Sequence, residues 1–396
     1  MKTLRLLAIF CLSAFAFASC GTPSDDNGGG VSSPLLLVAD KTTIYDNGED
    51  AVTFSLYYDG ATLTEGYEIY IDNATMLEGN TFTSNTVGTV KAQAMYGTVT
   101  SNVVSINVTV TPPPAPAAPE DKNPEKTNFK RRVLLTQITG TGCQWCPLMI
   151  NAVHQAMEGE YGDDAVLTIA HVWNNNDPAY LFDAENLGLS LGTGGSAPYL
   201  FMDLNKQYET SYTKTAIDKN IQNRLDEVAV RGGIAVNSEY HAEKNYIVLN
   251  ATVKAKETAE FRIGAWLLED GINARQSNPN SIAPVEGVDF NTHDNCIRLA
   301  DSKKATYDFT GLELGTIEAG KTASREFALL LRSNGTGNQK TWNHDNLHLV
   351  VFISTKEGDK WYVNNVVKCP KHGSVDFEYE AAAVPETPET PETPEA

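Results

Sequence analysis

The sequence predicts a multidomain fold in which an α/β domain lies between two β-sandwich domains. Short alternating or β-branched runs fill residues 34–110, strand and helix patterns alternate over residues 128–228, and β patterns return over residues 229–380. The length of 396 residues also exceeds what one hydrophobic core usually organises. A hydrophobic content of 41% with 20% charged residues is typical of a folded chain.

The charge of the chain excludes some classes of partner. Fifty Asp and Glu residues against thirty Lys and Arg residues give a net charge of −20. This charge repels nucleic-acid phosphates and anionic lipids, so we expect no nucleic-acid partner and no polybasic membrane attachment. Beyond the first twenty residues no apolar run reaches the ~18 residues of a spanning helix, so we expect membrane contact only through a hydrophobic anchor.

Residues 1–19 have the order of a secretory signal peptide. Two basic residues precede an apolar run, residues 6–17, and Ala18-Ser19 lead directly to Cys20. This arrangement resembles a bacterial lipobox, which implies acylation of Cys20, by chains such as palmitate, as the new amino terminus. Several acyl chains hold a protein on a membrane without crossing it. An ordinary signal peptide with an incidental cysteine is the alternative.

Residues 20–33 carry no apolar pattern and are predicted to form a flexible tether. Gly21 directly after the cysteine resembles an outer-membrane sorting signal, and Ser24-Asp25-Asp26 is similar to surface-export signals of Gram-negative lipoproteins. We therefore expect a lipid-anchored outer-membrane protein that faces the periplasm or the cell surface. Disulfides persist in such a compartment.

Residues 34–110 are predicted to form an antiparallel β-sandwich. Turn signals such as Asp59-Gly60 separate five β runs, which cover residues 35–38, 51–58, 67–71, 89–95 and 103–110. Segments 40–45, 79–82 and 100–102 resemble bacterial immunoglobulin-like surface modules. No catalytic cluster occurs here, so we interpret the module as a spacer, with carbohydrate or protein binding as the alternative.

A proline-rich linker, residues 111–127, separates this module from a different pattern. The alternation of strands and helices predicts an α/β domain over residues 128–228, with strands at 133–138, 165–172 and 199–204 and helices at 147–160, 182–189 and 212–228.

The remainder, residues 229–380, returns to β patterns and is predicted to form a second sandwich. Its six runs cover residues 233–240, 246–255, 261–269, 324–333, 347–354 and 360–367, with a loop over residues 270–292. The tail, residues 381–396, repeats Pro-Glu-Thr and is expected to be disordered because it holds nothing to bury.

The chemistry centres on Cys143-Gln144-Trp145-Cys146, which follows a predicted strand and opens a predicted helix. Two intervening residues place both sulfurs on the first helical turn, close enough to form a bridge. The helix dipole lowers the pKa of the first thiol, so Cys143 is the expected nucleophile and Cys146 the resolving cysteine. Pro147 is tolerated because its missing N–H has no intrahelical acceptor.

A second proline supports this site. Pro198 follows Ser196-Ala197 and immediately precedes a buried strand. Together with the C-x-x-C helix this order resembles the thioredoxin superfamily, which implies a cis Pro198 that faces the dithiol, and an Ala197 backbone that contacts substrate.

The layout as a whole narrows the resemblance. Segments 133–149, 196–204 and 232–380 are similar to the twenty-eight-kilodalton outer-membrane lipoprotein family of anaerobes, and the string 139–147 is the most specific part. This similarity implies location and architecture more than activity.

Two residues depart from the thioredoxin pattern. Gly142 stands where an aromatic residue is common, and Gln137 stands where a buried carboxylate commonly relays protons. An amide cannot accept the resolving thiol's proton, so exchange is expected to be slower or to use water. His154 is too far along the helix to substitute and is interpreted as a surface or groove histidine. His171 is a better neighbour, with a core histidine as the alternative.

Three interpretations of the Cys143/Cys146 pair remain: thiol-disulfide exchange, a structural bridge in a surface adhesin or scaffold, and metal binding. Cys296 and Cys369 are predicted to form a second, structural disulfide; free buried thiols are the alternative, and zinc would need both as further ligands. We expect no cofactor. The expected partners are the membrane, through the lipid, and either thiol or disulfide proteins or a surface ligand.

Overall fold

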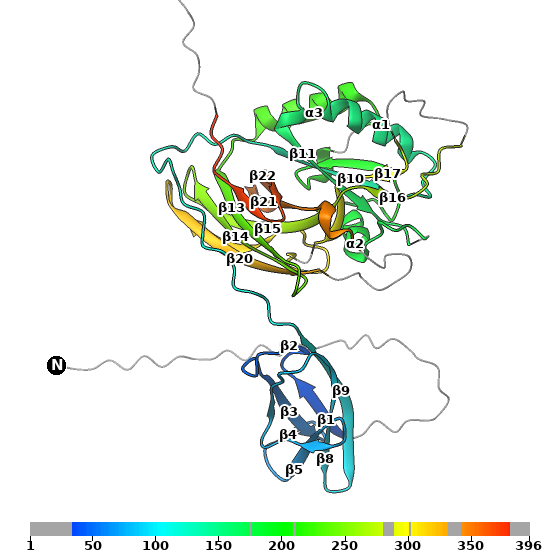
Figure 1. The fold of residues 1–396 in the computed structure, drawn as a ribbon, viewed down its shortest axis with the longest axis vertical. Helices are drawn as coiled ribbons and strands as arrows, with labels where there is room; N and C mark the ends of the chain where they lie inside the picture. Colours follow the sequence, from blue (N-terminus) through cyan, green and yellow to red (C-terminus); the bar gives the residue numbers. More distant parts are fainter. Residues whose placement is uncertain are drawn as a thin grey trace, which may run out of the picture. The chain divides into compact units, whose positions relative to one another are not determined.

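The computed structural model describes residues 34–174, 176–208, 211–279, 289–300, 302–331 and 342–380. The chain divides into two compact units, Met1–Thr111 and Pro112–Ala396, at the start of the predicted linker (Figure 1). The predicted signal peptide, the tether with Cys20 and the tail at 381–396 lie outside the described residues.

The first unit is a two-sheet β-sandwich, as predicted. Its sheets have the orders β1-β3-β4, with β7 beside β3, and β2-β9-β8-β5-β6. All pairs are antiparallel except β2 and β9, which run parallel. The strands are β1 (Leu35–Ala39), β2 (Thr43–Tyr45), β3 (Val52–Tyr58), β4 (Ala61–Leu63), β5 (Tyr67–Ile71), β6 (Thr75–Met76), β7 (Thr81–Phe82), β8 (Gly88–Tyr96) and β9 (Val99–Thr109).

Local sequence explains this sandwich. β1 alternates buried and exposed residues because one face meets the core, where Leu35, Leu37 and Phe54 pack together. Asp59 and Gly60 both adopt positive φ and close the β3–β4 hairpin, the geometry that an Asp-Gly turn favours.

The second unit contains the predicted α/β alternation followed by β strands. Its elements are β10 (Val133–Thr139), α1 (Cys146–Met157), β11 (Ala165–His171), α2 (Phe182–Ser190), β12 (Tyr199–Met202), α3 (Lys214–Glu227), β13 (Gly232–His241), β14 (Tyr246–Ala255), β15 (Ala259–Glu269), β16 (Ile272–Asn273), β17 (Thr292–His293), β18 (Cys296–Leu299), β19 (Leu312–Ile317), β20 (Thr322–Leu330), β21 (Leu347–Glu357), β22 (Lys360–Pro370) and β23 (Gly373–Val375).

One sheet runs through both parts of this unit, in the order β12-β10-β11-β18-β15-β21-β22, with β19 beside β15. The junction is a parallel pairing of β11 with β18, at Ile169 and Cys296. The segments predicted as separate domains, 128–228 and 229–380, therefore share one sheet within one compact unit. The sequence did not reveal this because β18 is only four residues long and had no separate pattern.

Both faces of this sheet are covered. The helices α1 and α3 lie on one face of its α/β part and α2 lies on the other (Figure 1). The sheet β20-β14-β13-β23 packs against β15 and β21 and makes the predicted second sandwich. Side chains of β15 alternate between two cores, with Leu267 on the sandwich side and Trp266 on the α2 side. Burial on both sides explains why strands such as β15 are almost continuously apolar.

The predicted linker is held against the second unit. Asn237 and Asn250 donate side-chain hydrogen bonds to the carbonyls of Ala117 and Pro116. The buried Lys254 ammonium lies 2.7 Å from Asp121 Oδ2 and also donates to two linker carbonyls. A buried ammonium needs such partners, so this part of the linker is a docked strap rather than a spacer.

A buried carboxylate connects the α/β part to the rest of the unit. Asp203, directly after β12, accepts hydrogen bonds from Arg131 Nη2 at 2.7 Å and from Arg224 Nε of α3 at 2.9 Å. Its second oxygen accepts from the Leu134 amide of β10 at 2.9 Å. Arg224 continues to Glu357 at the end of β21. All three residues of the Asp203 network, Asp203, Arg131 and Arg224, are buried, so each charge depends on the others.

Asp203→Asn is expected to lower the free energy of unfolding of the second unit by about 3–5 kcal/mol, because it leaves the buried Arg131 guanidinium without its counter-ion and leaves Arg224 with Glu357 alone. Tryptophan fluorescence in a urea titration measures this unit selectively, since all five tryptophans lie in it, at positions 145, 173, 266, 342 and 361. The exposed Asp226→Asn in α3 is the matched control. Equal stability of the two variants would contradict the role of the Asp203 network.

Candidate functional site

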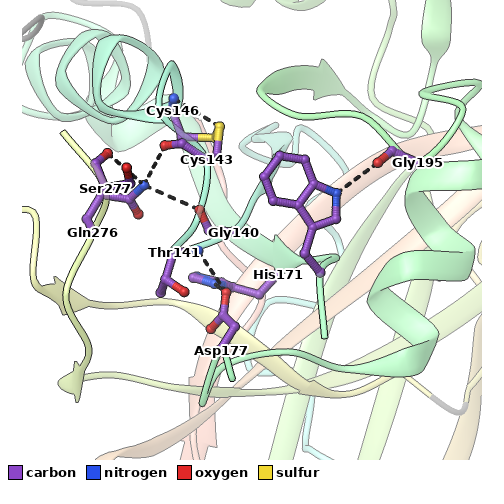
Figure 2. Close-up of a disulfide and its surroundings, with 10 residues drawn as sticks. Gly140, Thr141, Cys143, Cys146, His171, Asp177, Gly195, Gln276 and Ser277 are labelled. Atoms are coloured by element: carbon purple, nitrogen blue, oxygen red, sulfur yellow. Dashed lines mark hydrogen bonds and ion pairs between the residues drawn. A yellow bond between two sulfur atoms is a disulfide. The ribbon is translucent and has the colours of Figure 1, made fainter. Parts of the chain in front are cut away.

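The two cysteines of the C-x-x-C motif form a disulfide at the start of α1 (Figure 2). The helix begins at Cys146, with Pro147 in its first turn, close to the predicted start. The Cys146 amide donates a hydrogen bond to Cys143 Sγ, at 3.1 Å. The first sulfur therefore accepts a hydrogen bond from an otherwise unpaired amide of the helix terminus.

The two cysteines of the disulfide are buried. Cys143 is 2% exposed and Cys146 is fully buried, whereas Trp145 between them is 60% exposed. In this closed, oxidised arrangement neither cysteine is open to solvent.

A segment from the β-rich part covers the motif. The side-chain amide of Gln276 donates to the carbonyl of Cys143 at 2.8 Å and to that of Gly140 at 3.3 Å (Figure 2). The Ser277 amide donates to the Thr141 carbonyl at 2.8 Å. Sequence reasoning treated residues 270–292 as a loop and missed this contact, because no local pattern links positions more than 130 residues apart.

A buried acid and imidazole lie beneath the same turn. Asp177 Oδ2 is 2.8 Å from His171 Nδ1 and accepts a hydrogen bond from the Thr141 amide at 2.8 Å. Burial raises the pKa of Asp177, but the charge and hydrogen bond of His171 and the amides of Thr141 and Ala179 outweigh it and lower the pKa to about 2. His171, predicted as a neighbour of the site, thus acts on the turn through Asp177.

A second imidazole packs against the first. The ring of His293, in β17, lies 5.0 Å from that of His171 and nearly perpendicular to it. His293 Nε2 lies 3.0 Å from the carbonyl oxygen of Ala274, in the covering segment. Burial, and then the charge of His171, lower the pKa of His293. The covering segment and the buried acid are thus joined through two histidines.

Pro198 lies beside the same end of the sheet. The Ala197–Pro198 peptide bond is cis, as predicted. Tyr199, the next residue, pairs with Ile138 near the end of β10, and the motif follows β10 after a short turn. The loop before Pro198 is fixed by Trp173, whose indole N–H donates to the Gly195 carbonyl at 2.8 Å (Figure 2).

The remaining sequence candidates lie along α1 and β10. Gln137 is buried on the face that carries α1, and its Nε2 has no hydrogen-bond partner among the described residues. No carboxylate occupies that position. His154 is partly exposed, 3.4 Å from Glu158 one turn along the helix, in agreement with its interpretation as a surface histidine.

The predicted Cys296–Cys369 disulfide is absent; both are free and buried. Cys296 pairs across β18–β15 with Glu269, which pairs with Leu347 of β21, while Cys369 pairs with Leu349 of β21. Three strand spacings, roughly 14 Å along the sheet, therefore separate them, whereas a disulfide needs Cα atoms within about 7 Å.

These two thiols are also unsuited to reaction. Burial raises the pKa of Cys296 well above its usual value and that of Cys369 to about 11. Within the described ranges, no group of three or more His, Cys, Asp or Glu side chains is arranged to hold a metal ion.

The geometry defines a class of protein: an α/β unit with a disulfide at a helix terminus, continuous with a β-sandwich. A sequence model of the outer membrane protein Omp28 family matches residues 198–372. Among solved structures, HBP35 of Porphyromonas gingivalis is similar, with 17% identity over 66% of this chain and 82% of that chain and a TM-score of 0.46. No curated protein matches.

The family match gives this protein an outer-membrane location, as predicted from the sequence. In the part of the chain that the structure describes, no helix has the length and apolar character needed to cross a membrane.

The lowered pKa of Asp177 predicts an acid-sensitive contribution to stability. A carboxyl with a folded pKa of about 2 and an unfolded pKa near 3.8 stabilises the fold above about pH 4 and loses this contribution as the pH falls towards 2. Asp177→Asn is therefore expected to be less stable than wild type by about 2 kcal/mol at pH 5, with a difference that closes by pH 2. Tryptophan-monitored denaturation at pH 5 and at pH 2 measures the difference in stability between variant and wild type. The exposed Asp163→Asn is the control. A difference that does not change with pH would contradict this assignment.

Proposed function

We propose that this protein is a lipid-anchored outer-membrane protein that performs thiol-disulfide exchange through Cys143 and Cys146. The observation that carries the proposal is the position of the disulfide at the start of α1, where the Cys146 amide donates to Cys143 Sγ. The same amide and the helix dipole favour a thiolate on Cys143 after reduction.

The surrounding architecture supports this function. The order β10-α1-β11-α2-β12-α3, with a cis proline immediately before β12, is similar to the thioredoxin superfamily in the features quoted from the sequence. On this proposal the Ala197–Pro198 backbone lies against the substrate in the mixed disulfide. The first unit, which resembles an immunoglobulin-like module, serves as a spacer between the membrane anchor and the reactive unit.

In the proposed reaction the Cys143/Cys146 dithiol reduces a substrate disulfide. The Cys143 thiolate attacks one sulfur of a substrate disulfide, the substrate S–S bond breaks, and the departing thiolate takes up a proton. Cys146, as a thiolate, then attacks Cys143 Sγ and releases the second substrate thiolate. Two electrons pass from the protein dithiol to the substrate. Because Gln137 cannot accept the proton of Cys146, water is the expected acceptor, which slows this second step.

One observation favours a second candidate, a structural bridge in a surface-binding protein. Both cysteines are buried. Gln276 donates hydrogen bonds to the carbonyls of Gly140 and Cys143, in the turn that joins β10 to α1. Structural disulfides in secreted proteins typically have potentials below about −300 mV. A redox titration of the Cys143–Cys146 pair therefore separates the candidates: a more oxidising midpoint supports exchange, and resistance to reduction down to that range supports a structural bridge.

Single cysteine variants test the assigned roles. Cys146→Ser is expected to trap a mixed disulfide through Cys143, because the attacking sulfur remains and the resolving sulfur is gone. Cys143→Ser is expected to trap none. Non-reducing gels and mass spectrometry after incubation with a disulfide substrate measure the adducts. Equal adducts from both variants would show that the roles are assigned wrongly.

The proposed anchor has its own test. Cys20→Ala is expected to release the protein into the periplasm or the medium, because the acyl chains provide the hydrophobic contact with the membrane. Membrane fractionation with immunodetection measures the distribution. The conservative Ser19→Ala, which keeps the cysteine, is the control and is expected to stay with the membrane. Retention of the Cys20→Ala protein would overturn the lipid anchor.

A further inference from the structure

A cavity of about 690 Å³ lies beside the C-x-x-C turn. Thr141 and Gly142, the two residues before Cys143, form one wall. Residues 273–275 and 277–279, from the segment that covers the dithiol, also line the cavity, and Asn176 and Pro178 contribute from the loop that carries Asp177. A cavity of this volume is in the range that holds a small molecule.

The lining of this cavity favours an anion. It contains one charged side chain, Arg275, and no Asp or Glu, although the whole chain has a net charge of −20. Arg275 is exposed and also lines a second cavity that contains Asp289, but no salt bridge joins these two residues in the part of the chain that the structure describes. Asn273 and Asn278 add polar groups to the lining. A guanidinium in such a setting is suited to a carboxylate, which it can bind through two parallel hydrogen bonds.

The covering segment limits what can reach the sulfur. Gln276 contacts the carbonyl of Cys143 itself, and Cys143 is 2% exposed. Ala274 and Gln276 are in turn held by Asn291, through the hydrogen bonds Ala274 N to Asn291 O and Gln276 N to Asn291 Oδ1. We expect a folded protein to displace more of this segment than a small molecule does, because the small molecule starts from the cavity beside Thr141 and Gly142.

In the closed arrangement one polar atom of Gln276 lacks a hydrogen-bond partner among the described residues. Its Nε2 donates to three carbonyls, those of Cys143, Gly140 and Ser277, but its Oε1 is buried without a hydrogen-bond partner among the described residues. A buried acceptor without a donor lowers the stability of the closed arrangement, so displacement of this side chain is less costly than three contacts suggest.

We propose that the reaction partner of this dithiol is a low-molecular-weight thiol, or its disulfide, that carries a carboxylate. Arg275 binds the carboxylate, and Gln276 is a specificity-determining residue that disfavours folded proteins. This inference rests on the proposed exchange function. The reduced protein transfers two electrons to the small disulfide through a Cys143 mixed disulfide, which yields two small thiols and the Cys143–Cys146 bridge; the reverse reaction reduces the protein.

The experiment uses the reduced full chain and two small disulfides of opposite charge, oxidised glutathione and cystamine. Acid quenching, alkylation and mass spectrometry measure the rate at which the Cys143–Cys146 bridge returns. A Cys143→Ser/Cys146→Ser variant gives the background from Cys296 and Cys369. The measured quantity is the ratio of the rate constants for glutathione disulfide and cystamine, which cancels general effects on the thiolate.

Arg275→Gln is expected to lower this ratio by about threefold to tenfold, the range for one charge-assisted contact near the surface. Arg275→Lys is expected to retain most of it, and raised salt is expected to reduce the ratio in wild type but not in Arg275→Gln. Arg325→Gln, on the distant strand β20, is the matched control and is expected to leave the ratio unchanged. An unchanged ratio in Arg275→Gln would overturn the carboxylate site.

Gln276→Ala tests the proposed role of Gln276 in disfavouring folded proteins, with insulin as the protein disulfide. We expect this variant to react faster with insulin, relative to glutathione disulfide, by about threefold or more, since the contact to the Cys143 carbonyl is lost. No relative gain would overturn the specificity role of Gln276. If the reduced wild type re-forms its bridge with none of the three disulfides, the exchange function itself fails. If the bridge re-forms but the ratio of the two rate constants does not depend on Arg275, the exchange function stands and only the carboxylate site is overturned.

Discussion

The second unit depends on one buried carboxylate, Asp203, which holds two arginines and a β10 amide at the point where β12 ends. Asp203 is the one ion-pair partner of Arg131 among the described residues, whereas Arg224 also pairs with Glu357, so loss of Asp203 would leave Arg131 as an unpaired buried charge, which costs several kcal/mol. The pairing therefore fixes α3 against β10 and, through Arg224 and Glu357, against the end of β21. The position of the α/β part on the remaining sheet follows from this constraint.

Because the sheet is continuous, residues from both the α/β part and the β-rich part form the reactive site. Because β11 pairs with β18, which pairs with β15, residues 270–279 start close to the end of β11, and Gln276 and Ser277 contact the C-x-x-C turn. Gln276 and Ser277 donate to the backbone carbonyls of Cys143 and Thr141 in this turn. The β-rich part is thus a component of the site, and a version of the α/β part alone would expose the sulfurs.

Two opposing effects meet at Cys143. The helix terminus supplies an amide to its sulfur, which favours the thiolate, while burial by the covering segment disfavours a charge and keeps partners away. Asp177 steadies the same turn through the Thr141 amide and is kept ionised by His171. The reactivity of Cys143 therefore depends on how readily the covering segment moves, as well as on the two sulfurs.

The sequence by itself determined the longer elements and the nature of the central motif. Apolar periodicity located β10, α1, β11, α2, β12 and α3 within a few residues, and a C-x-x-C at a strand-to-helix turn identified the bridge, because these signals depend on neighbours along the chain. Only the tertiary structure decided the shared sheet, the free Cys296 and Cys369, and the cover by Gln276. Each of these is set by strand pairing or packing between residues far apart in sequence, for which no local pattern exists.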